Sequence, residues 1–193
     1  MNDKIERRNF GTSELVNIQN KRIDTDYYVE GYATVFEKKY LLGTYAGKEF
    51  FETVSRNALN GTDLSDIKLM YNHGGKVLAR NTNGTLGYEI NSKGFLIFAD
   101  LSKTAASRDF WEEISVGLIN QMSFAFDIEE ESFNEKTNTR TVMKIGKIYE
   151  VSATPFPANE QTEIYARSKI NESIAKRASI LSMSIKLLTG GTK

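Results

Sequence analysis

Three polar residues, His73, Ser123 and Glu150, have the side-chain types that nucleophilic attack on a carbonyl group requires. In such a site a serine oxygen attacks, and a histidine takes the serine proton and later returns it to the leaving group. A carboxylate fixes the tautomer of the imidazole and stabilises its charged form. His73 is the only histidine in the chain, so an imidazole base must be this residue. The chain order histidine, serine, carboxylate is permitted, because the order differs between unrelated folds.

Each of the three residues also has an ordinary structural interpretation. His73 could be an exposed or hydrogen-bonded histidine at the end of a strand, and Ser123 could be a plain strand serine. Glu150 could be an outward-facing glutamate on a half-exposed strand. Against this last option, Glu150 stands between Tyr149 and Val151, and a charged residue among apolar neighbours needs a partner or an outlet to water. Single residues therefore leave both interpretations open.

The segments that carry these residues have the alternation typical of strands. Residues 67–73, IKLMYNH, predict a strand that places His73 on one face with Ile67, Leu69 and Tyr71. Residues 119–128, INQMSFAFDI, also alternate, so that Ser123 and Ala125 face away from a large apolar face. That apolar face comprises Met122, Phe124, Phe126 and Ile128.

One helix interrupts the strands. In residues 104–118, TAASRDFWEEISVGL, apolar residues recur at helical spacing from Ala106 to Leu118, with Thr104 or Ser107 as the N-cap. Turn signals at Asn83-Gly84 and at residues 92–94 separate further strands, and EEESFNEKTNTR predicts a solvated hairpin loop. We therefore expect an α+β domain, a mostly antiparallel β-barrel or folded sheet with a few helices.

Three regions are predicted along the chain. Residues 1–20 are polar and predict a flexible arm, residues 21–167 form the main domain, and residues 168–193 predict an amphipathic helical tail. Residues 167–193 contain six Lys or Arg and one Glu, a local excess of five positive charges. Such a tail suits either docking onto an acidic partner or packing against the domain, and both options stay open.

Composition excludes several classes of function. Lys+Arg and Asp+Glu both number 25, so no net charge indicates a nucleic acid or a membrane as partner. The chain has no cysteine, which removes thiolate metal sites, and with one histidine a zinc site is not expected. A metal-dependent nuclease is a poor match, because the DIEEE carboxylates alternate between strand faces. No cofactor motif and no G-x-S-x-G elbow is present, and we expect no cofactor or metal.

Several segments, taken in order, resemble the prohead proteases of tailed bacteriophages, which are distantly similar to the herpesvirus assemblins. They are VEGYATVF, GKEFFETVSRNAL, LMYNH, GTLGYEINSKGFLIFADL, FWEEISVGLINQMSFAF and KIYEVSATPFPANEQTEI, and together they span roughly residues 28–164. Each match is modest, but their order and spacing are specific to the family.

The resemblance implies an assemblin-like fold and a serine endopeptidase. It makes His73 the base, Ser123 the nucleophile and Glu150 the third member. Assemblins use a second histidine as third member, which this chain lacks, so a carboxylate is expected instead. Two glycines, Gly74 and Gly75, follow the histidine where many family members have a polar or acidic residue.

The function that follows is maturation of a phage procapsid. The protease would lie inside the procapsid in the host cytoplasm and would cleave scaffold segments, capsid-protein segments and itself. A homo-oligomer is one option, and no membrane or specific nucleic acid is expected as partner. The alternative is a non-catalytic β-barrel scaffold or binding module of the virion, in which the serine and histidine are incidental.

Overall fold

The computed structural model describes residues 6–10, 21–45 and 47–154 of the 193-residue chain. Their regular elements are β1 (Glu6–Phe10), β2 (Tyr28–Val35), β3 (Tyr40–Tyr45), β4 (Lys48–Val54), β5 (Lys68–Tyr71), β6 (Gly74–Arg80), a 3-10 turn η1 (Asn81–Asn83), β7 (Leu86–Ile90), β8 (Gly94–Asp100), α1 (Ala105–Ser115), β9 (Gln121–Asn134) and β10 (Thr139–Thr154). The predicted C-terminal tail lies outside the described residues.

The described strands form two sheets and no closed barrel. The larger sheet has seven strands in the order β1-β9-β10-β4-β3, with β5 paired to β10 and β6 paired to β5, and the smaller sheet has the order β2-β8-β7. Most pairings are antiparallel, as predicted, but β10 pairs with both β4 and β5 in parallel. The α+β class is confirmed. A β-barrel, one of the two forms expected, is not found among the described strands, because the alternation of side chains predicts strands but not which strand edges pair.

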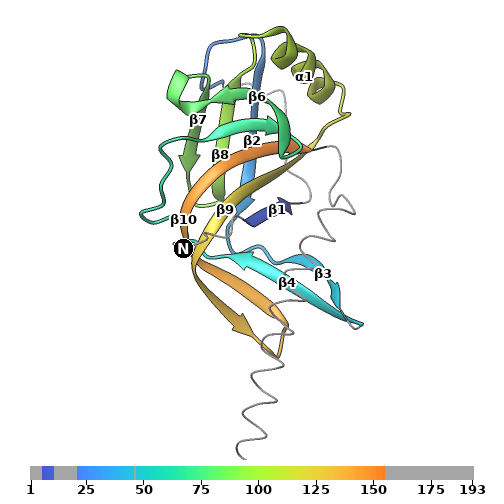
Figure 1. Cartoon of the computed structure of the whole chain (residues 1–193), viewed down its shortest axis with the longest axis vertical. Coiled ribbons are helices and arrows are strands. Elements are labelled where there is room, and N and C mark those ends of the chain that lie inside the picture. The colour runs from blue at the N-terminus through green and yellow to red at the C-terminus, as the bar shows by residue number, and fades with distance from the viewer. Residues whose placement is uncertain (1–5, 11–20, 46, 155–193) are drawn as a thin grey trace, which may run out of the picture.

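The core lies between the two sheets. Its buried apolar side chains come from both sides, including Val29 and Ile97 of the smaller sheet and Phe124, Phe126 and Val151 of the larger. Figure 1 shows β9 and β10 as a long bent pair that runs through the molecule, with the smaller sheet behind its upper half. The pairing of these two strands therefore fixes the relative positions of Ser123, on β9, and Glu150, on β10.

The predicted helix is confirmed as α1, but it is shorter than its pattern. Thr104 is the N-cap, and its Oγ1 accepts a hydrogen bond of 3.0 Å from the backbone of Ser107. The helix ends at Ser115 because Gly117, with φ +80°, adopts the left-handed conformation that ends many helices. Leu118 was expected on the buried helical stripe and is instead 69% exposed, beyond the end of α1.

The polar segment EEESFNEKTNTR forms the solvated hairpin that was predicted, but most of it is strand and only residues 135–138 are turn. β9 continues to Asn134, and β10 starts at Thr139 after a short turn. The side chains at this end of the hairpin are mostly exposed, so no apolar alternation reveals the strands in the sequence. Cross-strand ion pairs, Glu131 with Arg140 and Glu129 with Lys144, stabilise the projecting hairpin instead.

The predicted N-terminal arm contains a strand that the sequence did not indicate. β1 pairs antiparallel with the outer edge of β9, and Asn9 lies opposite Ser123 in the register. Its sequence, ERRNF, has little of the apolar alternation by which strands are recognised. β1 is thus defined by its backbone pairing with β9.

Candidate active site

His73 lies in a tight turn at the tip of the β5–β6 hairpin. Tyr71 and Gly74 are paired across the hairpin, which leaves Asn72 and His73 as the two turn residues. Both have positive φ, 46° and 58°, as in the type I′ turns that join two strands. Asn at the first position suits this turn, but the second position usually carries glycine. A histidine there holds an unfavourable backbone conformation, a kind of strain that collects at functional sites.

The turn moves the ring of His73 to the face of Glu150. In the parallel pairing of β5 with β10, Leu69 and Tyr71 lie beside Val151 and Ala153, so they share the opposite face of the sheet. The Nδ1 atom of His73 lies 2.6 Å from Oε1 of Glu150. The expectation that His73 shares a face with Leu69 and Tyr71 is therefore wrong, because two left-handed residues interrupt the alternation before the histidine.

The contact between His73 and Glu150 is shielded from solvent. The side chains of His73 and Glu150 are 10% and 7% exposed. An ionised carboxylate has no proton to donate, so the hydrogen bond requires a proton on Nδ1 of the histidine. That tautomer leaves Nε2 as an acceptor whenever the ring is neutral, which is the form a general base needs.

Ser123 lies on β9, on the face that Glu150 occupies on β10. In the antiparallel register Ser123 is opposite Ser152, and Ala125 is opposite Glu150. Directly opposed residues of such a pair have Cβ atoms about 5 Å apart on the same face. Ser123 and Ser152 are fully buried, with 0% exposure each. The alternation predicted for residues 119–128 is confirmed, since Met122, Phe124 and Phe126 belong to the core cluster.

Backbone and side-chain hydrogen bonds tie the histidine turn to β10. The backbone N–H of Asn72 donates to the carbonyl of Ala153 at 3.1 Å. The backbone N–H of His73 donates to Oγ of Ser152, also at 3.1 Å. Both bonds are made at the end of β10 that lies opposite Ser123. The structure thus brings all three sequence-predicted residues to one face of the β9–β10–β5 region.

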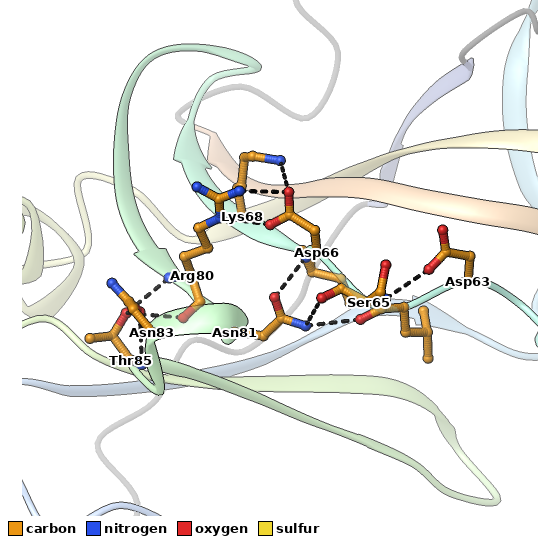
Figure 2. Close-up of polar contacts among 10 residues, drawn as sticks. Asp63, Ser65, Asp66, Lys68, Arg80, Asn81, Asn83 and Thr85 are labelled. Carbon is orange, nitrogen blue, oxygen red and sulfur yellow. Dashed lines mark hydrogen bonds and ion pairs between the residues drawn. The ribbon is translucent and has the colours of Figure 1, made fainter.

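A polar clamp holds the other end of the β5–β6 hairpin. Asp66 receives hydrogen bonds from Arg80, at 2.6 and 2.7 Å, and from Lys68, at 2.9 Å. The side-chain Oδ1 of Asn81 accepts a hydrogen bond of 2.9 Å from the backbone N–H of Ile67. Figure 2 shows Asp66 between Arg80 and Lys68, with Asn81 beside it. Hydrogen bonds from Arg80 and Lys68 hold the pKa of Asp66 well below its usual range.

Helix α1 supports the hairpin from one side. Ser107 Oγ donates to the carbonyl of Leu78 on β6 at 2.9 Å, and Ser107 is 1% exposed. The rings of Phe110 and Tyr71 meet edge to face with centroids 5.5 Å apart. The β5–β6 hairpin therefore contacts β10 and α1, and the clamp links its two strands. These contacts fix the position of the turn that carries His73.

Within the described ranges, no cluster of three or more His, Cys, Asp or Glu residues could hold a metal ion. In the same ranges no helix is both long enough and apolar enough to span a bilayer. The residues present at the site can accept and donate protons and can supply a hydroxyl nucleophile.

A family model described as "Caudovirus prohead serine protease" matches residues 15–177. The chain belongs to this family. The match covers most of the sequence and includes His73, Ser123 and Glu150. The resemblance seen in the ordered segments of the sequence is therefore confirmed, and the protein is a prohead protease by family.

Comparison with solved structures finds a similar fold in another phage protein. The chain is similar to the bacteriophage T4 capsid assembly protease, gp21, with a TM-score of 0.50 and 10% sequence identity. The similarity covers 78% of this chain and 97% of the T4 protein. No curated protein matches the sequence.

The sequence did not indicate that Ser152 and Asn72 make the hydrogen bonds that join the His73 turn to β10. No role was predicted for Ser152, although a serine between Val151 and Ala153 in a buried strand is a polar exception. Asn72 precedes His73 and two glycines, a composition typical of a tight turn. A turn at this position breaks the alternation of side chains, so it would have predicted that His73 does not share a face with Leu69 and Tyr71.

Proposed function

We propose that this prohead protease is a serine endopeptidase that uses Ser123 as nucleophile, His73 as base and Glu150 as the residue that orients the base. The observation that carries the proposal is the 2.6 Å contact between His73 Nδ1 and Glu150, beside the strand that bears Ser123. The family supports peptide-bond hydrolysis as the reaction.

The chemistry follows from the tautomer that this contact selects. Glu150 accepts from Nδ1, so Nε2 of His73 takes the Ser123 proton as the hydroxyl oxygen attacks the peptide carbonyl. The imidazolium then gives its proton to the leaving amine, and an acyl-enzyme forms on Ser123. Water, deprotonated by His73, attacks the acyl group, and the returned proton frees the serine. Glu150 stabilises the charged ring in both halves of the cycle and does not itself take the proton.

The proposed substrates are protein segments of the assembling capsid. Scaffold and capsid-protein segments would be cut inside the procapsid within the host cell, and the protease would also cut itself. The similar T4 protein is titled a capsid assembly protease, which supports this setting. A non-catalytic module of the virion is the competing interpretation.

Self-trimming separates the two interpretations without knowledge of a cleavage motif. Purified wild-type chain, aged and followed by intact mass, should lose defined terminal segments. Ser123→Ala and His73→Ala should stay full length, because loss of a nucleophile or its base costs on the order of a million-fold in turnover. Fragments that form equally fast in wild type and Ser123→Ala would remove the serine mechanism. Full-length chains in all three samples, with no cleavage of added scaffold protein, would favour the non-catalytic module.

A further inference from the structure

Ser152 is a fully buried hydroxyl next to the proposed catalytic pair. It is 0% exposed, lies on β10 two residues after Glu150, and is opposite Ser123 in the register. Its Oγ accepts the backbone N–H of His73 at 3.1 Å. A serine side chain in the interior of a strand is therefore bonded directly to the turn that carries the histidine.

The turn needs such a bond because its backbone is strained. His73 has φ +58°, a conformation that non-glycine residues adopt rarely. The neighbouring turn residue Asn72 is held by a backbone bond to Ala153, which any residue at 153 could provide. The bond at His73 depends on a side chain, and among small strand residues only serine or threonine supplies a hydroxyl acceptor.

We infer that Ser152 is a positioning residue, which holds the His73 backbone so that the ring keeps its contact with Glu150 and its reach toward Ser123. The inference rests on the proposed function of His73 and deepens it. Glu150 and Ser152 hold the histidine at two points, one on Nδ1 of the ring and one on the backbone N–H. The bond to Ser152 fixes the backbone of His73 and the contact with Glu150 fixes its ring, so the two together set the direction in which the ring points.

The single histidine makes the test direct, because every imidazole signal of the full-length chain comes from His73. NMR of chain labelled with ¹⁵N-histidine reports the Nδ1 proton and the tautomer. Kinetics would use a peptide that spans the self-cleavage site mapped in the wild type. Ser152→Ala removes the acceptor, and Ser152→Thr keeps a hydroxyl. Thr34→Ala is the matched control, since Thr34 is also a strand residue with a hydroxyl and 0% exposure, but it lies on β2 of the smaller sheet.

We expect Ser152→Ala to fold, to broaden or lose the Nδ1 proton signal, and to lower kcat about 100-fold with KM unchanged, the cost of a misplaced catalytic group. Ser152→Thr should restore the signal and most of kcat. Thr34→Ala should leave both readouts at wild-type values. If Ser152→Ala does not fold, Ser152→Cys fills the space with a weaker acceptor and should change both readouts in the same direction.

Folded Ser152→Ala with wild-type imidazole signals and wild-type kcat would reduce Ser152 to a structural residue and overturn the inference. Covalent labelling of Ser152, in place of Ser123, by a fluorophosphonate would make it the nucleophile and also overturn it. A wild-type chain that cleaves nothing would refute the proposed function, while the imidazole signals would still decide whether Ser152 positions the ring.

Discussion

At the scale of single residues, the molecule combines a strained histidine with a buried carboxylate. The left-handed backbone conformation of His73 lowers the stability of the folded chain. Glycine, the usual residue at this turn position, would avoid that cost. Local violations of this kind are expected where a residue is kept for function. Glu150, nearly buried and in contact with the imidazole, is a second residue whose placement folding alone does not explain.

The strain at residue 73 predicts an unusual order of stabilities. His73→Ala and His73→Gly both remove the ring contact with Glu150, but alanine keeps the left-handed cost and glycine does not. We expect the glycine variant to be more stable than the alanine variant by about 1 kcal/mol, the reverse of the usual order in a strand or helix. Urea denaturation of the two inactive proteins measures the difference. An alanine variant as stable as the glycine variant would show that the turn carries no strain.

Glu150→Gln removes the negative charge of the side chain but keeps its shape, so it tests the role of the charge. Glutamine occupies the same space, but its amide can offer an N–H to Nδ1 and so favour the wrong tautomer. We expect kcat to fall, by up to about ten-thousand-fold on the precedent of other triads. Cleavage of a peptide that spans the self-cleavage site measures kcat for the two folded proteins. Equal kcat values for wild type and Glu150→Gln would leave a serine–histidine pair oriented by another group.

At the scale of elements, the β5–β6 hairpin is the part that the sequence predicted least completely. The strand before His73 and the turn at Asn83-Gly84 were evident from alternation and composition. The rotation of His73 to the Glu150 face was not, because it depends on the backbone angles of two turn residues. The parallel pairing of β5 with β10 was equally hidden, since strands 68–71 and 139–154 are distant in the chain and no local signal records their register.

The clamp at the base of this hairpin predicts an acid sensitivity. The pKa of Asp66 is lowered in the folded state, chiefly by its hydrogen bond from Arg80. A carboxylate with a lowered folded-state pKa stabilises the fold above its unfolded pKa of roughly 4, and this contribution is lost as pH falls through the folded-state pKa. Asp66→Asn should therefore make the urea midpoint less dependent on pH between about pH 4 and pH 2.

Urea midpoints at several pH values, for wild type and Asp66→Asn, check this prediction. Asp109→Asn, at an exposed position on α1, is the matched control and should follow the wild type. Equal slopes for wild type and Asp66→Asn would mean that the clamp does not contribute to the pH dependence of stability.

At the scale of the whole molecule, the two-sheet architecture arises from a core that both sheets share. The class, the helix and the placement of Ser123 opposite the apolar face were predictable, because burial imposes periodicity on the sequence. The division into two sheets and the pairing of β1 were not, because they depend on contacts between distant segments. The domain boundaries at residues 20 and 167 stay predictions.

The position of β1 predicts a change in self-association. β1 covers the outer edge of β9, from Met122 to Phe126, and an uncovered edge strand is a template for pairing with another chain. Deletion of residues 1–10 should leave the core intact but promote association between copies, seen as a rise in sedimentation coefficient with concentration. Full-length chain at the same concentrations is the control, and an unchanged sedimentation coefficient would count against the covering role of β1.

In the proposed mechanism, Ser123 is a nucleophile that His73 activates. Covalent labelling by a fluorophosphonate, with the modified residue located by peptide mass spectrometry, tests this activation. We expect one label per active chain, on Ser123, in the wild type, and no label above background in folded His73→Ala. Absence of label in a folded wild type that trims itself, or label on another residue that is unaffected by His73→Ala, would contradict this mechanism.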